Sequence, residues 1–140
     1  MTATANIPLG AAATRTVQVT RELTVAHFHP HMPEVYGTPM MIYLMEVAAT
    51  DAIAAYLPEG WVSVGLKVDI THLAATPAGF TVTATARVVA VGDDNTVTFA
   101  VEAHDGMERI GTGTHVRAAV ATERFARRFQ AKQAGVPTQR

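Results

Sequence analysis

Residues 38–57 read TPMMIYLMEVAATDAIAAYL, and their only ionisable groups besides Glu46 are two tyrosines and one aspartate. The pair Thr38 and Pro39 suits an N-cap and a first helical position, and the Pro-Glu-Gly segment at 58–60 suits the end of a helix. Apolar residues occur nearly all round this helix, which is typical of a helix enclosed by other elements. The stretch therefore predicts one long central helix.

After this helix the apolar period changes from 3.6 to 2. In WVSVGLKVDITH, residues 61–72, apolar side chains occupy the even positions Val62, Val64, Leu66, Val68 and Ile70. Such alternation predicts a half-buried strand with one face on the helix. Further alternations at 80–88 and 97–103 and a segment at 108–120 predict three more strands, and residues 14–25 predict a first one. Turn signals at 92–95 and at Asp105-Gly106 separate them.

These elements predict an α+β protein with the hotdog fold, in which an antiparallel sheet of about five strands wraps around one long central helix. TERFARRFQAK, from Thr122 as N-cap, predicts a short amphipathic C-terminal helix. We expect one domain over 1–140, with 1–13 and 134–140 as loose ends. Open sheet edges are commonly paired between subunits, so we expect a homodimer or a tetramer.

Composition excludes several classes of partner. Eleven basic and twelve acidic residues give a net charge of -1, which favours neither nucleic acid nor an anionic membrane. The chain has no cysteine, so it cannot use disulfides or a thiolate nucleophile, and a reducing, cytoplasmic setting is expected. No signal segment and no run of about 18 uncharged apolar residues is found.

Glu46 and His72 are the candidates for chemistry. Glu46 projects from an apolar helical stripe, where a carboxylate is costly unless it is paired or used. Thr38 lies eight residues earlier, roughly 12 Å along the helix axis. His72 continues the even parity of its strand, toward the helix, and could form an acid/base pair with Glu46. Each residue also has a structural interpretation. Glu46 could be a salt-bridge partner, His72 a hydrogen-bonded core histidine, and Thr38 a helix cap.

The segments PEVYGTPMMIYLMEVA, THLAATPAG, AHDG and IGTGTHVRA resemble, in order and spacing, those of the fluoroacetyl-CoA thioesterase family of hotdog proteins. The resemblance runs from about residue 24 to residue 129. It implies hydrolysis of an acyl-CoA thioester without any cofactor besides the coenzyme A of the substrate. It also implies that Thr38, Glu46 and His72 form the catalytic group and that Gly65 and Arg117 belong to the substrate-binding site.

The loop before the helix differs from the family's best-known member. Met32 and His29 stand where that protein carries phenylalanines that shield its pocket. We therefore place Met32 in the substrate site and expect a short-chain acyl-CoA as substrate, without selectivity for a fluorinated acetyl group. Glu46 is expected to act as general base or nucleophile, Thr38 to orient by hydrogen bonding, and His72 to serve the leaving group or the carbonyl. Arg117 could contact the phosphates of coenzyme A.

Three alternatives remain open at the level of the sequence. A hotdog hydratase or dehydratase would take its histidine from the segment before the helix, at His29 or His31. A non-catalytic acyl-CoA-binding protein would keep the pocket without turnover. Finally, His27, His29 and His31 lie at period 2 and could hold zinc or nickel, but Pro30 between them disfavours a common face, and we predict no metal site.

Overall fold

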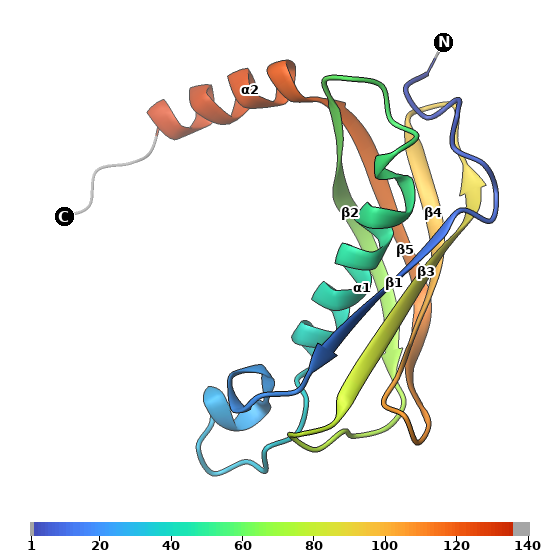
Figure 1. The fold of residues 1–140 in the computed structure, drawn as a ribbon. Coiled ribbons are helices and arrows are strands. Elements are labelled where there is room, and N and C mark those ends of the chain that lie inside the picture. Colours follow the sequence, from blue (N-terminus) through green and yellow to red (C-terminus); the bar gives the residue numbers. More distant parts are fainter. Residues whose placement is uncertain (1, 136–140) are drawn as a thin grey trace.

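The computed structural model describes residues 2–135, which form one five-stranded antiparallel sheet with a long helix lying across it (Figure 1). The strands are β1 (Ala12–Gln18), β2 (Trp61–His72), β3 (Thr81–Val91), β4 (Thr96–His104) and β5 (Arg109–Ala121), and the helices are α1 (Thr38–Ala54) and α2 (Thr122–Ala134). Two short 3-10 turns, η1 (Arg21–Leu23) and η2 (Val25–His27), precede α1. The strand order is β1-β3-β4-β5-β2, so β1 and β2 are the edges.

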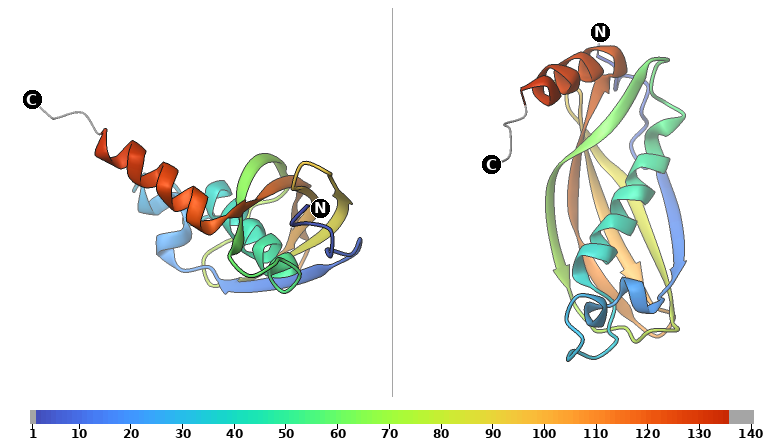
Figure 2. Two further views of the ribbon diagram at one scale, coloured as in Figure 1. Left: turned by 90° about the horizontal axis from the view of Figure 1, so that it is seen from above. Right: turned by 90° about the vertical axis from the view of Figure 1, so that its left-hand side faces the viewer.

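The core lies between α1 and the sheet, and the sheet curves around this helix, as Figure 2 shows. The inward positions of β3 and β4 are the predicted ones: Val82, Ala84, Ala86, Val88, Val97, Phe99, Val101 and Ala103 are all buried. From α1 the buried residues are Met41, Met45, Ala48, Ala49, Ala52 and Ile53. The predicted hotdog arrangement is therefore confirmed. Within residues 2–135 no helix is long and apolar enough to cross a membrane.

A bulge in β2 corrects the predicted parity of that strand. Gly65 pairs with Arg117 and Lys67 with Val116, so Leu66 has no partner and the strand shifts by one residue. An inserted residue exchanges the two faces of a strand. Odd positions therefore face α1 before the bulge, and even positions face it after the bulge. The prediction of one inward parity from residue 62 to residue 70 was wrong for the first half of the strand.

The bounds of several elements also differ from the sequence predictions. The first strand ends at Gln18, because the chain turns through η1 and η2 rather than continuing extended to residue 25. The N-caps of α1 and α2 are Gly37 and Ala121, and neither Thr38 nor Thr122 makes a side-chain cap hydrogen bond. The helix α1 ends at Ala54, before the segment at 58–60 where the sequence predicted its end.

The N-terminal segment is packed rather than loose. Thr4 is fully buried, Ile7 belongs to the core, and the backbone N–H of Ala3 donates to Asn95 Oδ1 at 2.8 Å. At the other end, α2 leaves the sheet and has no buried residue, and residues 136–140 lie outside the described part of the chain (Figure 1).

One side of α1 is not covered by residues 2–135. Tyr43 has 66% of its surface exposed although it lies in the middle of the apolar helix. The helix is therefore enclosed by its own sheet on one side only, whereas its composition predicted enclosure all round.

Candidate active site

Thr38 and His72 are brought together at one end of the sheet. Thr38 is the first residue of α1 and His72 is the last of β2. Thr38 Oγ1 lies 2.7 Å from His72 Nδ1, which is a short hydrogen bond. The Thr38 hydroxyl, which the sequence suggested as a helix cap, is thus hydrogen-bonded to the imidazole of His72.

The other ring nitrogen of His72, Nε2, is buried and has no hydrogen-bond partner among residues 2–135. Buried polar atoms nearly always have one. A groove of about 360 Å³ lies here, and both Thr38 and His72 line it. Burial lowers the pKa of His72 below its ordinary value and outweighs the opposing effect of the Ala74 backbone. A neutral imidazole with a free nitrogen therefore borders an open groove.

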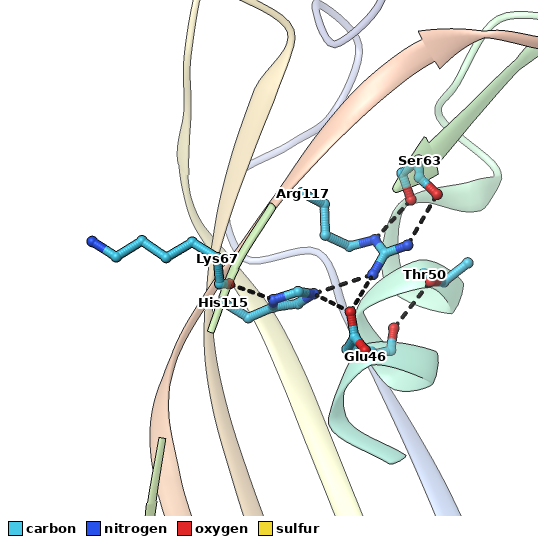
Figure 3. A network of polar contacts seen from close by, with 6 residues as sticks. All are labelled: Glu46, Thr50, Ser63, Lys67, His115 and Arg117. Atoms are coloured by element: carbon cyan, nitrogen blue, oxygen red, sulfur yellow. Dashed lines mark hydrogen bonds and ion pairs between the residues drawn. The ribbon is translucent and has the colours of Figure 1, made fainter. Parts of the chain in front are cut away.

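Glu46 belongs to a second cluster, shown in Figure 3. Its Oε2 lies 3.5 Å from Arg117 Nη1 and 3.7 Å from His115 Nε2. Arg117 is anchored in turn by Ser63, because its Nε donates to Ser63 Oγ and its Nη2 to the Ser63 carbonyl, each at 2.9 Å. The Glu46 side chain is 33% exposed, so the carboxylate is paired on one side and open on the other.

Gly65 provides the space for this carboxylate. A Cβ atom at position 65 would overlap Glu46 Oε2 and would lie 3.3 Å from the His115 ring. Gly65 is on an odd position before the bulge, which is why it faces α1. To admit a methyl group, the flexible end of Glu46 must move and the His115 ring must shift by a few tenths of an ångström.

We therefore expect Gly65→Ala to displace the Glu46 carboxylate from Arg117 while the fold persists. The expected catalytic role of Glu46 predicts that kcat falls by about 10- to 100-fold, since a displacement of about 1 Å in a reacting group can cost on the order of 100-fold in rate. Thermal unfolding should change little, because a side-chain end and not the backbone is moved. A Gly65→Ala variant with undiminished kcat would contradict this role.

The predicted catalytic group is thus divided within one chain. Thr38 and His72 form one pair, whereas Glu46 lies with Arg117 and His115, and within residues 2–135 Glu46 makes no hydrogen bond or ion pair with Thr38 or His72. Eight helical residues rotate a side chain by about two turns plus 80°, so Glu46 leaves the helix in a different direction from Thr38. A substrate would have to span the two clusters.

The two other predicted site residues are placed differently. Arg117 is 7% exposed and its guanidinium is engaged with Ser63 and Glu46, so it faces the carboxylate rather than a phosphate. Met32 is 48% exposed in the turn before α1 and does not line the groove of His72. His29 lines a separate groove with Pro39.

Within residues 2–135 no group of three or more His, Asp or Glu side chains is arranged to hold a metal ion. His27 lies in η2 with its ring edge against Phe28, at a centroid distance of 4.9 Å. The segment with His27, His29 and His31 therefore forms turns and is not an extended chain.

Sequence reasoning missed His115 and Ser63. His115 is 1% exposed, its Nδ1 lies 2.8 Å from the Lys67 carbonyl oxygen, and its Nε2 lies 3.1 Å from Arg117 Nη1. Burial lowers its pKa most strongly, Arg117 adds to this, and the Lys67 carbonyl and Glu46 oppose it. The alternation of β5 could have indicated His115, because position 115 lies on the same face of the strand as the predicted site residue Arg117.

Stability should decline on acidification because of His72 and His115. Their pKa values lie below the 6.5 of an ordinary histidine, so the unfolded chain binds protons that the folded protein does not. The free energy of unfolding then rises with pH and falls as the pH drops below about 6.5. Urea unfolding at pH 7.5 and pH 5.5 measures this, and His72→Asn should show a shallower decline. Equal stability at both pH values would contradict it.

Comparisons with solved structures define the class of protein. A hot-dog-like protein from Thermanaerovibrio acidaminovorans matches with a TM-score of 0.84 at 27% identity, over 94% of this chain and 97% of that one. A structure of the fluoroacetyl-CoA thioesterase FlK matches with a TM-score of 0.83 at 38% identity, over 93% and 98%. Together with the helix-borne carboxylate and the anchored histidine, these matches define a thioesterase with the hotdog fold.

The family follows from the sequence matches. A family model described as fluoroacetyl-CoA-specific thioesterase covers residues 19–123. The fluoroacetyl-CoA thioesterase of Streptantibioticus cattleyicolor is 42% identical over 115 residues, which are 78% of this chain and 82% of that protein. The chain belongs to the fluoroacetyl-CoA-specific thioesterase family and is a thioester hydrolase.

Proposed function

We propose that this protein hydrolyses a short-chain acyl-CoA thioester, with Thr38, Glu46 and His72 as its catalytic residues and with no cofactor besides the coenzyme A of the substrate. The observation that carries this proposal is His72: one ring nitrogen is hydrogen-bonded to Thr38, and the other is buried beside a groove with no hydrogen-bond partner in the described part of the chain. We also propose that the chain is a single domain. The absence of cysteine fits a reducing, cytoplasmic setting.

We assign the roles of Glu46, Thr38 and His72 from the polar atoms that each can offer to the substrate. Glu46 takes a proton from water as the water oxygen attacks the thioester carbonyl carbon. The C–S bond then breaks, the carboxylic acid is released, the thiolate takes up a proton from solvent, and Glu46 returns its proton to solvent. Thr38 donates a hydrogen bond from its hydroxyl to His72 Nδ1, so that Nε2 carries the ring proton and donates a hydrogen bond to the departing sulfur. Direct attack by Glu46, through a mixed anhydride, yields the same products.

A screen of acyl-CoA esters tests the reaction. Acetyl-, propionyl-, butyryl- and fluoroacetyl-CoA are incubated with the protein, and a thiol-reactive dye measures the coenzyme A released. Turnover of at least one ester is expected. Saturable binding without thiol release would indicate a binding protein, and hydration of an enoyl-CoA that depends on His29 or His31 would indicate a hydratase.

We further propose a homodimer formed along β2. This strand is twelve residues long, lies at the sheet edge, and exposes apolar side chains, with Leu66 at 59%. Long apolar edges are normally covered, and pairing of two such strands covers both.

Leu66→Glu is expected to shift the dimer toward monomers, because it places like charges near each other along the paired edges. Sedimentation velocity of the variant and the wild-type protein measures the change. Leu9→Glu is the matched control, because Leu9 is an exposed leucine outside the sheet. A monomeric wild-type protein, or an unchanged dimer in the Leu66→Glu variant, would count against this interface.

A further inference from the structure

The mechanism above gives no role to His115, a buried titratable group beside Glu46. His115 lies on β5 between α1 and the sheet, and its ring lies within contact distance of both Arg117 and Glu46 (Figure 3). We propose that His115 is a positioning residue, which in its neutral form directs the Arg117 guanidinium toward the Glu46 carboxylate. This inference rests on the proposed function of Glu46.

The hydrogen bonds of His115 define its tautomer. Nδ1 lies 2.8 Å from the Lys67 carbonyl oxygen, which can only accept, so Nδ1 carries a proton. Nε2 lies 3.1 Å from Arg117 Nη1, which can only donate, so Nε2 presents its lone pair. Both contacts are satisfied only by a neutral ring protonated on Nδ1. Burial, the strongest influence on the pKa of His115, favours the neutral ring as well.

Arg117 has its orientation restricted by three partners. Two of its nitrogens donate to Ser63, which fixes one side of the planar guanidinium. The third, Nη1, faces both His115 Nε2 and Glu46 Oε2. Because a neutral Nε2 presents only a lone pair to the carboxylate, the attraction on Glu46 comes from Arg117. The ring of His115 therefore sets where Nη1 stands, and Nη1 restrains the carboxylate.

The His115 ring is itself held in its plane. It stacks on the buried Phe99 with a centroid distance of 6.1 Å and an interplanar angle of 28°. Phe99 on one face and the Lys67 carbonyl at Nδ1 restrict the orientation of the ring. A fixed acceptor of this kind reduces the number of positions that a long, flexible arginine can adopt.

Two substitutions separate positioning from packing. In His115→Gln the longer amide reaches the place of Nε2 and its oxygen can accept from Arg117. In His115→Asn the shorter amide can donate to Lys67 in place of Nδ1 but does not reach Arg117. We expect Gln to retain kcat within about threefold and Asn to lose about 10- to 100-fold, with KM within about twofold for both, because His115 does not touch the substrate. His104→Gln, at an exposed histidine, is the control.

Two results would overturn the proposal: a full kcat in folded His115→Asn, or equal losses in the Gln and Asn variants, which would indicate packing alone. If the variants fail to fold, ¹⁵N NMR of the wild-type protein still decides, because a proton on Nε2 or a charged ring at neutral pH would contradict the assigned tautomer. A wild-type protein inactive on every acyl-CoA, or a fully active Glu46→Gln, would refute the proposed function instead, whatever the tautomer of His115.

Discussion

Glu46→Gln is expected to lower kcat for acyl-CoA hydrolysis by about 10²- to 10⁴-fold, the usual contribution of a general base. Glutamine has the same shape, and its amide oxygen can still accept from Arg117 Nη1, which stands 3.5 Å from Glu46 Oε2. The fold should therefore persist while the base is lost. Steady-state thiol release, together with the thermal unfolding midpoint, measures both effects.

Glu59→Gln is the matched control for this experiment. Glu59 is an exposed glutamate in the segment between α1 and β2, and its neutralisation makes the same change of net charge. Its kcat should equal that of the wild-type protein. If Glu46→Gln turns over substrate as fast as Glu59→Gln, Glu46 is neither base nor nucleophile.

His72→Asn is expected to lower kcat by about 10²-fold or more without loss of stability. Asparagine keeps a polar atom near the position of Nδ1, so the bond with Thr38 Oγ1 can persist, whereas nothing replaces Nε2. Since no atom of the described residues is a hydrogen-bond partner of the buried Nε2, its removal should leave the thermal unfolding midpoint unchanged or raise it. A loss of activity without a loss of stability would indicate that His72 serves the reaction and not the fold.

His104→Asn controls for the loss of a histidine as such. Its side chain is exposed at the end of β4, with Glu102 3.8 Å away as its ion-pair partner, and it is not among the residues of either cluster. Unchanged kcat is expected there. A His72→Asn variant that keeps its kcat and unfolds at a lower temperature would show that His72 is a structural residue.

Much of this protein could be predicted from local patterns. The long apolar helix and the alternation in β3 and β4 predicted the fold, because burial on one face requires that periodicity whatever the neighbours are. Glu46 stood out for a similar reason, since a carboxylate in an apolar helix needs a partner or a use. The resemblance then added Gly65 and Arg117, both of which lie beside Glu46.

Only the tertiary structure decided which of these residues meet. Parity counting assumes a constant period, and the bulge at Leu66 breaks it, so Ser63 and Gly65 turn toward α1 against the count. The bond between Thr38 and His72 joins residues 34 apart in sequence, which no local pattern encodes. Sequence determined the elements and their apolar faces because these depend on near neighbours, whereas the polar partners were decided by contacts that form only when the sheet closes on the helix.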